Sequence, residues 1–451
     1  MDAFNEYVAS HTDRFVAELM DLARRPSIAA QGIGLAENAA WVRDRLARLG
    51  ADARLIEVKD GAPVVFGELG ERGPILMIYN HYDVQPPEPL DLWETPAFAP
   101  AIRDGKLYAR GVADNKGNLV ARIQAVEAWL ATRGELPVRL RWVVEGEEEI
   151  GSVHLEHFVD ENEALLRGAD GCLWEAGYRD VAERPVLAMG LKGIMYVELR
   201  VRSAFRDLHS ANAAIVPNAA WRLTWALNSL KDEQDNILID GFMDHVVSPP
   251  AEALAAAAAL PFDADLLKQT YGIDAFINGL EGEAAVHKLL FTPTCTICGL
   301  ESGYTGAGSK TVLPAAAMAK IDFRLVPDVQ PDVVLRLLRE HLDRRGFTDV
   351  EIVDLGGEPP ARSPVDSRVA LAARQAVETV YGQPALVYPN MAGSGPMYYL
   401  CDRLGIPAVT AGCGYVGSNV HAPNENIRLA DYVSHILFMG ELMRRFGASA
   451  A

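Results

Sequence analysis

Histidine and acidic side chains recur in this sequence directly after apolar, strand-like runs. His81 and Asp83 follow the run 75–79, while Glu175 and His421 each follow a similar run later in the chain. The carboxyl ends of strands are where open α/β sheets place their ligands. A neutral imidazole nitrogen can bind a metal ion, and an acid two residues further on can hold the other ring nitrogen. These four residues are therefore candidates for a metal site.

Further carboxylates come from two turns. Asp114 stands in a glycine-flanked turn before an expected helix, where an aspartate often serves only as the helix N-cap. The segment 145–149 carries four glutamates, three of them consecutive at 147–149. Such a run is either a solvated acidic loop or a cluster held together by cations, with one acid left free as a base. Oxygen and imidazole ligands without a thiolate fit Zn²⁺, Mn²⁺ or Co²⁺ in a hydrolytic site.

Hydrophobic patterns predict the elements that must hold these residues. Helical periodicity is found at 12–24, 37–49 and 115–133. The runs 75–79 and 138–144 are typical of strands, the first of them covered on both faces. Strands that alternate with helices indicate an α/β domain with a largely parallel sheet. The candidate ligands thus stand at successive strand ends of that sheet.

The pattern changes after about residue 190. Alternating strands are expected at 196–201 and 318–326, and helices at 219–230 and 332–345. An alanine-rich run at 251–259 is expected to form an ordinary exposed helix in the same region. Because the alternation is typical of half-exposed strands, this part of the chain predicts a second, α+β domain.

The α/β character returns after a turn-rich break at 356–360. The elements expected there are a helix at 366–381, a strand at 385–388, a helix at 395–404 and a strand at 406–411. We therefore predict a catalytic domain in two parts, residues 1–189 and 359–451, interrupted by a smaller inserted domain at 190–358.

Composition excludes several function classes. The 451 residues are 49% hydrophobic, which is enough for a large core, and the net charge of −19 argues against a nucleic-acid or anionic-membrane partner. No stretch is apolar over the ~18 residues that a membrane helix needs. The five cysteines, an odd number, do not indicate a disulfide framework. The first residues lack the features of a signal peptide, so a cytoplasmic protein is expected.

The ordered motifs resemble those of the di-zinc metallopeptidase family that includes carnosine dipeptidase, aminoacylase, glutamate carboxypeptidase and succinyl-diaminopimelate desuccinylase. The motifs are His81-x-Asp83, the Asp114 turn, Glu148-Glu149, Glu175, Asp207-Leu208-His209-Ser210, Arg324-Leu325-Val326-Pro327 and His421. The resemblance covers nearly the whole chain. It implies a mostly parallel-sheet catalytic domain with an inserted lid and dimerisation domain.

The resemblance also implies a site for two divalent metal ions, with zinc favoured over manganese or cobalt. The implied metal ligands are His81, Asp114, Glu149, Glu175 and His421. Asp114 resembles the carboxylate that bridges the two ions and is joined to Asn115 by a cis peptide. Asp83 resembles the acid that orients His81, and Glu148 resembles the general base. Alignment on Gly151-Ser152 leaves Glu147 as a spare carboxylate.

Other residues implied by the resemblance lie in or near the inserted domain. His209 resembles a histidine that stabilises the oxyanion from the partner subunit, which implies a homodimer formed through this domain. Arg324 resembles a residue that binds a substrate carboxylate, since a guanidinium suits bidentate contacts. Gly393 and Ser394 resemble a loop that also contacts this carboxylate.

Two function classes follow from these patterns. The first is a hydrolase that cleaves the amide bond of dipeptides or short peptides with a free C-terminal carboxylate, using a metal-bridging water and Glu148 as base. Within this class, deacylation of N-acyl amino acids is the alternative, because a glutamate at Glu175 resembles the carboxypeptidase and deacylase members. The second class is a non-catalytic binding protein on the same scaffold. Retention of Glu148 and of every ligand favours the enzyme.

Overall fold

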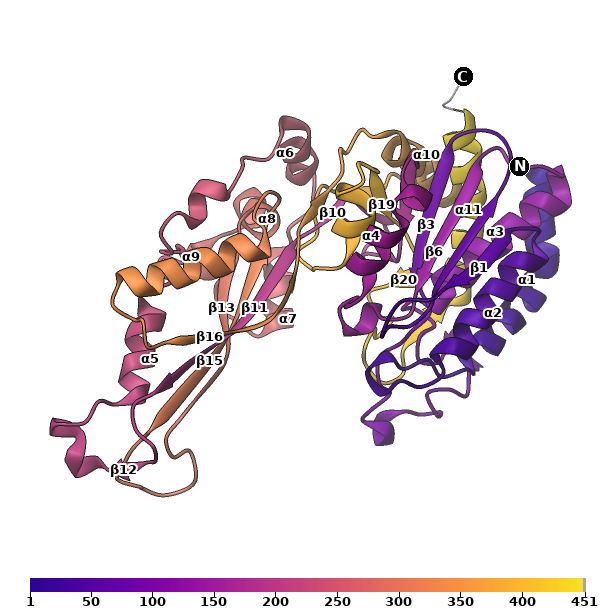
Figure 1. The fold of residues 1–451 in the computed structure, drawn as a ribbon. Coiled ribbons are helices and arrows are strands. Elements are labelled where there is room, and N and C mark those ends of the chain that lie inside the picture. Colours follow the sequence, from indigo (N-terminus) through magenta and orange to yellow (C-terminus); the bar gives the residue numbers. More distant parts are fainter. Residues whose placement is uncertain (449–451) are drawn as a thin grey trace. The chain divides into compact units, whose positions relative to one another are not determined.

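The computed structural model describes residues 1–448 and divides into two compact units (Figure 1). Unit 1 comprises Met1–Gly190, Arg362–Pro389 and the chain from Pro396 onward, and unit 2 comprises Leu191–Ala361 and Asn390–Gly395. The segment 359–451 of the sequence prediction is therefore divided between the units. Asn390–Gly395 belongs to unit 2 because the Lys192 amide donates to the carbonyls of Met391 (3.2 Å) and Gly393 (2.9 Å).

Unit 1 contains a six-stranded sheet in the order β1-β2-β6-β3-β7-β19. The strands are β1 (Asp52–Ile56), β2 (Val64–Leu69), β3 (Ile75–His81), β6 (Arg139–Glu145), β7 (Gly171–Trp174) and β19 (Ala408–Thr410). Strand β3 is parallel to both β6 and β7, and β19 is parallel to β7. Strands β1 and β2 extend the other edge with antiparallel pairing. The mostly parallel sheet confirms the α/β fold expected from the sequence.

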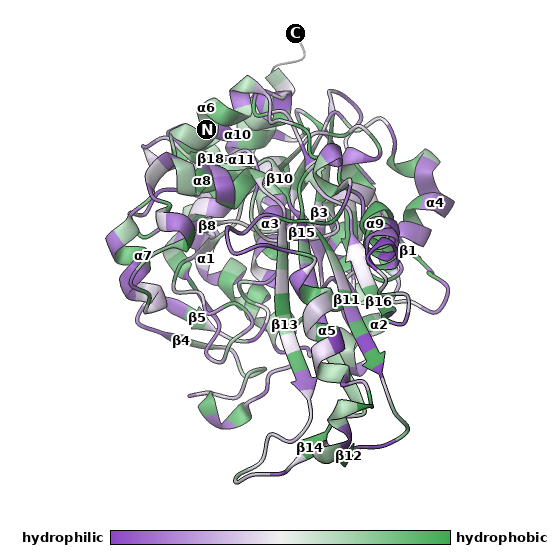
Figure 2. Cartoon of the chain, turned by 90° about the vertical axis from the view of Figure 1, so that its left-hand side faces the viewer, coloured by the Kyte–Doolittle hydropathy of each residue, from purple (hydrophilic) through white to green (hydrophobic). Residues whose placement is uncertain are grey.

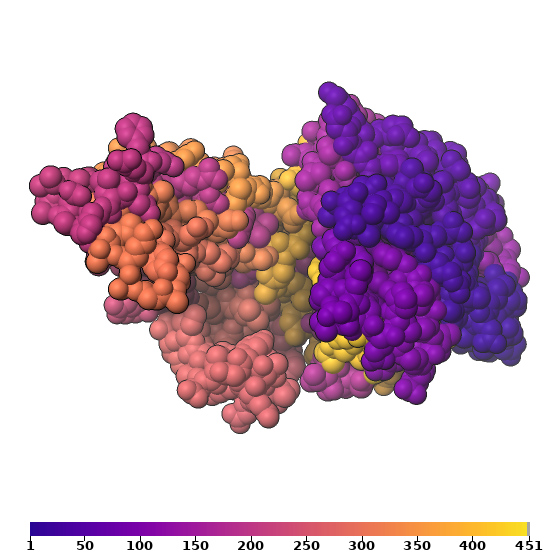
Figure 3. Space-filling view, turned by 90° about the horizontal axis from the view of Figure 1, so that it is seen from below, coloured from indigo at the N-terminus to yellow at the C-terminus, as the bar shows by residue number. Residues whose placement is uncertain are grey.

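Long helices accompany this sheet. They are α1 (Asp2–Ala23), α2 (Leu35–Arg48), α3 (Lys116–Arg133), α4 (Leu155–Leu166), α10 (Arg368–Tyr381) and α11 (Leu429–Ala448). Helix α3 packs against α1 and α11, and every residue from Lys116 to Val126 is buried. Yellow C-terminal segments accordingly lie beside indigo and purple N-terminal ones in the space-filling view (Figure 3). Because α3 is buried from Lys116 to Val126, the polar side chains of this part must find partners inside unit 1.

Short strands complete unit 1, and two of them, β10 and β17, lie where the chain passes from one unit to the other. They are β4 (Ala101–Arg103), β5 (Lys106–Tyr108), β8 (Tyr178–Arg179), β9 (Val186–Ala188), β10 (Gly190–Leu191), β17 (Ala361–Arg362), β18 (Leu386–Tyr388), β20 (Gly414–Tyr415) and β21 (Asn426–Arg428). Among the described residues, no helix is both long enough and apolar enough to span a membrane.

Unit 2 contains a four-stranded antiparallel sheet in the order β13-β15-β11-β16. Its main elements are β11 (Gly193–Arg202), α5 (Ala219–Asn228), β13 (Thr294–Ser302), β15 (Ala316–Leu325), α9 (Pro331–Arg344) and β16 (Glu351–Glu358). Its other elements are β12 (Leu208–His209), α6 (Ala251–Ala258), α7 (Ala264–Tyr271), α8 (Gly282–Phe291) and β14 (Val312–Leu313). The strands carry hydrophobic and hydrophilic residues together (Figure 2). Val197 and Phe323 belong to the hydrophobic core of the unit, together with Leu223 of α5 and Leu338 of α9.

Two local predictions need correction. The expected break at 356–360 is largely strand, because β16 continues to Glu358 and pairs with β11 across a β-bulge. The expected helix at 395–404 shrinks to a π-helical turn at Tyr398–Asp402. Glycine and proline at residues 393–396 account for the late start of this turn, since both residue types disfavour a helix interior.

Candidate metal centre

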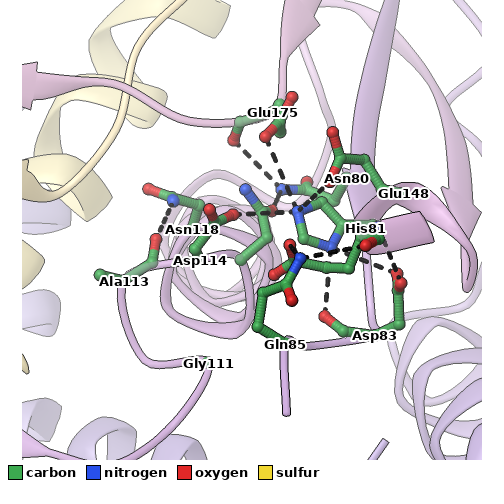
Figure 4. A network of polar contacts seen from close by, with 12 residues as sticks. Asn80, His81, Asp83, Gln85, Gly111, Ala113, Asp114, Asn118, Glu148 and Glu175 are labelled. Carbon is green, nitrogen blue, oxygen red and sulfur yellow. Dashed lines mark hydrogen bonds and ion pairs between the residues drawn. The ribbon is translucent and has the colours of Figure 1, made fainter. Parts of the chain in front are cut away.

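The candidate ligands gather at one edge of the unit 1 sheet. His81 is the last residue of β3, Glu148 and Glu149 lie in the 3-10 turn after β6, and Glu175 comes directly after β7. Since β3 lies between β6 and β7 and is parallel to both, the carboxyl ends of the three strands meet. Asp114 reaches the same place from the turn before α3 (Figure 4). This is the location at which parallel α/β sheets hold ligands.

One half of the cluster surrounds His81. Its Nε2 atom lies 3.0 Å from Asp114 Oδ1, 3.7 Å from Glu175 Oε1 and 3.9 Å from Glu148 Oε2. The His81 ring is fully buried, while the three carboxylates are partly exposed. The nitrogen and the three carboxylates therefore face one small space, which opens towards solvent.

The other half surrounds His421, in the loop that follows β20. Its Nε2 atom lies 3.0 Å from Glu149 Oε2 and 3.3 Å from Asp114 Oδ2. The two oxygens of Asp114 thus face different histidines, Oδ1 towards His81 and Oδ2 towards His421. The peptide between Asp114 and Asn115 is cis, as the resemblance implies. A carboxylate in this position can bridge two ions.

Polar contacts fix the orientation of the ligand side chains. Asp83 is fully buried, and its Oδ1 atom lies 3.3 Å from His81 Nδ1, while Oδ2 accepts a hydrogen bond from the Glu149 amide (3.0 Å). Gln85 donates to Glu149 Oε2 (2.9 Å), and the Trp174 indole donates to Glu175 Oε2 (3.0 Å). Because Asp83 and the adjacent backbone carbonyl hold Nδ1, the Nε2 atom of His81 is the one presented to the cluster.

The electrostatics of the cluster favour added positive charge. Burial raises the pKa of Glu148, and the charges of neighbouring carboxylates raise it further; burial also raises the pKa of Glu149. Burial opposes ionisation of Asp114, but hydrogen bonds with His421 and His81 outweigh it and lower the pKa of this carboxyl. Hydrogen bonds with Asp114 and Glu149 raise the pKa of His421 to about 10. A site that draws protons onto its imidazoles is one where divalent cations can replace those protons.

The donor set fits divalent metal ions. Within residues 1–448, two groups of residues have potential ligand atoms that all lie within 4.8 Å of one another. One group is His81, Asp114 and Glu149, and the other is His81, Glu148 and Glu175. All donors are imidazole nitrogens or carboxylate oxygens, which suits zinc, manganese and cobalt better than a thiolate-preferring metal. Within the part of the chain that the structure describes, the basic groups that form ion pairs with the four carboxylates are histidines only, so the carboxylates need such cations to stay ionised together.

Glu147, the first of the three consecutive glutamates, makes its contacts outside the metal cluster. Glu147 accepts hydrogen bonds from the Ala62 amide (3.2 Å) and pairs with His154 Nδ1 (2.8 Å). His154, just before α4, is thus engaged outside the cluster. The contacts of Glu147 therefore differ from those of Glu148 and Glu149.

The candidate substrate residues lie in unit 2. Arg324, near the end of β15, donates from Nη1 to Ser394 Oγ (2.9 Å) and pairs through Nη2 with Asp322 (3.1 Å). Gly393 belongs to the same loop as Ser394, and its carbonyl accepts from the Lys192 amide. His209 is exposed on β12, and its Nδ1 atom accepts a hydrogen bond from the Ala211 amide (3.1 Å). The structure thus brings Arg324 and the 393–394 loop together.

The sequence profile of Peptidase family M20/M25/M40 matches residues 77–445. The chain belongs to this peptidase family. The match extends over both units and includes every residue of the metal cluster. The protein is therefore a hydrolase of the M20 peptidase family, which confirms the resemblance found in the sequence.

The chain is also similar to named dipeptidases and to a solved metallo-carboxypeptidase structure. The chain is 29% identical to a Beta-Ala-His dipeptidase of Rattus norvegicus, over 95% of this chain and 92% of that protein. It is 30% identical to a Cys-Gly metallodipeptidase of Schizosaccharomyces pombe, over 76% of each. Among solved structures, an M20 family metallo-carboxypeptidase from Sulfolobus solfataricus is 39% identical, with a TM-score of 0.90 over 96% of this chain and 99% of that one.

The structure reveals one further charged residue beside this M20 metal cluster. The Glu425 carboxylate is buried and accepts hydrogen bonds from Arg110 Nη1 (2.8 Å) and from the amides of Gly111 (2.9 Å), Ala113 (2.9 Å) and Asp114 (3.1 Å). It therefore ties the Asp114 turn to the loop that carries the second histidine. The only sequence signal for Glu425 was its place four residues after that histidine.

Proposed function

We propose that this chain is a zinc-dependent dipeptidase or carboxypeptidase that acts on short peptides with a free C-terminal carboxylate. The observation that carries the proposal is the position of Asp114 between His81 and His421, each at hydrogen-bonding distance from a different carboxylate oxygen. This arrangement suits two ions rather than one. The similar dipeptidases and metallo-carboxypeptidase named above support peptides as substrates.

The ion ligands divide into two sets around the bridging carboxylate. His81 and Glu175 would hold one ion, His421 and Glu149 would hold the other, and Asp114 would contact both. When bound, two divalent ions supply Lewis-acid polarisation of the scissile carbonyl and an activated water. The remaining work of the reaction falls to residues of the chain.

Glu148 is the proposed general base. It reaches the cluster without a place in either ligand set, and its Oε2 atom lies 3.9 Å from His81 Nε2. Burial raises the pKa of Glu148, which makes it a better proton acceptor than an exposed glutamate. We assign it the proton of the attacking water, which it then delivers to the leaving amine. Asp83 keeps the imidazole of His81 in the orientation that this geometry needs.

Arg324 is the proposed partner of the substrate carboxylate. Asp322 holds one side of its guanidinium, and Ser394 accepts from the other, so the planar group is fixed for a bidentate contact. The hydroxyl of Ser394 and the backbone at Gly393 would add donors to the same anion. These contacts account for a requirement for a free C-terminus.

His209 is the proposed donor to the tetrahedral oxyanion. Because its Nδ1 atom accepts from the Ala211 amide, a neutral ring carries its proton on Nε2, where it can be donated. We assign this contact to the active site of a partner subunit, with residues 190–358 as the lid and dimerisation domain and residues 1–189 and 359–451 as the catalytic domain. This assignment requires a homodimer, and we also propose that the protein is cytoplasmic.

Deacylation of N-acyl amino acids is the second candidate function. It uses the same ions, the same base and the same carboxylate contact, and differs only in what occupies the acyl side of the bond. The presence of Glu175 rather than an aspartate fits deacylation as well as carboxypeptidase activity, because glutamate at this position resembles the carboxypeptidase and deacylase members alike. The two functions therefore differ in substrate and share one mechanism.

A substrate panel tests the proposal. The apo-protein is reconstituted with zinc, cobalt or manganese and assayed with dipeptides, with the same dipeptides as C-terminal amides, and with N-acetyl amino acids. We expect metal-dependent cleavage of the free dipeptides and little cleavage of the amides, with Glu148→Gln as the inactive control. Faster turnover of N-acetyl amino acids supports the second candidate, and absence of hydrolysis with every metal refutes both.

A further inference from the structure

Arg122 of α3 lies fully buried near the carboxyl ends of the unit 1 strands. Its Nη1 atom donates to the Tyr79 carbonyl (3.0 Å) and to Asn80 Oδ1 (3.0 Å). Its Nη2 atom donates to the carbonyls of Trp174 (3.2 Å) and Ala411 (2.8 Å). Among residues 1–448, no carboxylate forms an ion pair with this guanidinium. Burying a cation among neutral oxygens without a counter-charge costs free energy of folding, which suggests that Arg122 has a specific role at this position.

The acceptors of Arg122 lie where the ladders between neighbouring strands end. Strands β3 and β7 pair from Leu76 to Ile78 and from Gly171 to Leu173, so the carbonyls of Tyr79 and Trp174 come one residue beyond that pairing. Strand β19 pairs with β7 up to Thr410, and Ala411 is the next residue. The planar guanidinium therefore joins backbone groups of three strands at, or one residue beyond, the points where the β3–β7 and β7–β19 pairings end.

Two of these strand ends lead directly to a metal-cluster residue, and the third leads to one through a longer segment. Asn80 is followed by His81, and Trp174 is followed by Glu175, whose backbone has the positive φ of 26°. Ala411 precedes β20, and the loop that follows β20 carries His421. The spacing of the three strand ends thus sets the positions of three proposed ligands.

Asn80 extends the network to the bridging carboxylate. Its Oδ1 atom accepts from Arg122, and its Nδ2 atom donates to the side-chain oxygen of Asn115 and to the backbone carbonyl of Glu175 (3.4 Å). Asn115 is joined to Asp114 by the cis peptide. Through one neutral amide, the guanidinium therefore also contacts the turn that carries the carboxylate between the two histidines.

We propose that Arg122 is a positioning residue for the metal centre, which holds the ends of β3, β7 and β19 at the spacing that lets their ligands share two ions. The inference rests on the metal site of the proposed function, and Arg122 itself touches neither ion nor substrate. A lysine keeps the charge, but its single ammonium cannot span acceptors on three strands. The fixed geometry of the guanidinium, not only its charge, is what the site needs.

The test compares Arg122→Lys and Arg122→Met with Arg141→Met. Arg141 serves as the control because it is also buried in unit 1 and donates to two backbone carbonyls, those of Leu166 (2.8 Å) and Arg167 (3.0 Å), in addition to its ion pair with Glu68 (2.8 Å). Zinc is titrated calorimetrically into each apo-protein whose fold is verified by circular dichroism. We expect both Arg122 variants to bind zinc about 10–100-fold more weakly, the range for residues that support metal ligands. Arg141→Met should keep the wild-type zinc affinity.

Three results overturn the proposal. The first is wild-type zinc affinity and stoichiometry in either Arg122 variant. The second is an equal loss of affinity in Arg141→Met, which indicates a general effect of losing a buried arginine. The third is failure of both Arg122 variants to fold while Arg141→Met folds, since Arg122 then serves the fold as a whole. The readout uses no substrate, so a wild type that binds two ions but cleaves no peptide refutes the function and leaves this inference standing.

Discussion

Replacing Glu425 by glutamine removes a charge beside the Asp114 turn and keeps the shape of the side chain. In the structure, Oε2 accepts from Arg110 and Gly111, while Oε1 accepts from Ala113 and Asp114. A carboxamide has a single acceptor oxygen, and its NH₂ group must face one of these two pairs of donors. Glu425→Gln therefore loses two hydrogen bonds in either orientation.

The size of the effect follows from the burial of this ion pair. The side chains of Arg110 and Glu425 are each only 1% exposed. Water therefore cannot take the place of the carboxylate beside the guanidinium. Removing one partner of a buried ion pair lowers the free energy of unfolding by about 3–5 kcal/mol. We add no separate cost for the hydrogen-bond donors left without an acceptor, because the effects of neighbouring groups are not additive. At roughly 2–4 °C per kcal/mol, the melting temperature of unit 1 should fall by about 6–20 °C.

Calorimetry on the apo-protein and a zinc titration measure the two consequences. Glu425→Gln should lower the melting temperature and weaken zinc binding about 10–100-fold, because it loosens the turn that presents Asp114. The control is Glu441→Gln, which removes an equally buried carboxylate paired with Arg444 and Arg445 on α11. It should lower stability without changing zinc affinity. Unchanged zinc binding in Glu425→Gln, or equal weakening in the control, refutes the reasoning.

Four further substitutions test the proposed roles. Glu148→Gln should lower kcat by about 10²–10⁴-fold with two ions still bound, whereas Glu149→Gln should also lose metal. Kinetics and elemental analysis measure both effects. If the two variants show the opposite phenotypes, the roles of base and ligand in the acidic run are shifted by one residue. Arg324→Met should raise KM for a dipeptide roughly 10–100-fold and leave its C-terminal amide unaffected, and equal effects on both contradict the carboxylate contact. Mixed chains of His209→Ala and Glu148→Gln should regain roughly a quarter of wild-type activity if His209 acts across a dimer, and none if it acts within its own chain.

The positions of the candidate ligands could be predicted from the sequence because local hydrophobic patterns indicate where strands end. The continuous apolar run 75–79 is typical of a strand covered on both faces, and this prediction places His81 at the end of the strand, where the structure has it. Strand β1 was not predicted, since Asp52–Ile56 is a short, mixed run at the antiparallel edge with no fully buried residue. Short edge strands carry little periodicity, so packing rather than pattern defines them.

The supporting residues could not be predicted in the same way. Glu425 meets the Ala113 amide across 312 positions of sequence, and Arg122 meets the Ala411 carbonyl across 289. Arg122 lies on the helix whose apolar face was predicted, where an arginine is expected to face solvent. Its burial depends on the enclosure of α3 by α1 and α11, which is a property of the folded unit.

The most direct test of the account is a titration of the apo-protein with zinc while dipeptide hydrolysis and bound zinc are measured together. The wild type should reach full activity at two ions per chain, because Asp114 faces both His81 and His421. Asp114→Asn should bind fewer ions and stay inactive. Full activity of the metal-free protein, or saturation at one ion per chain, contradicts the central claim that two ions share this carboxylate.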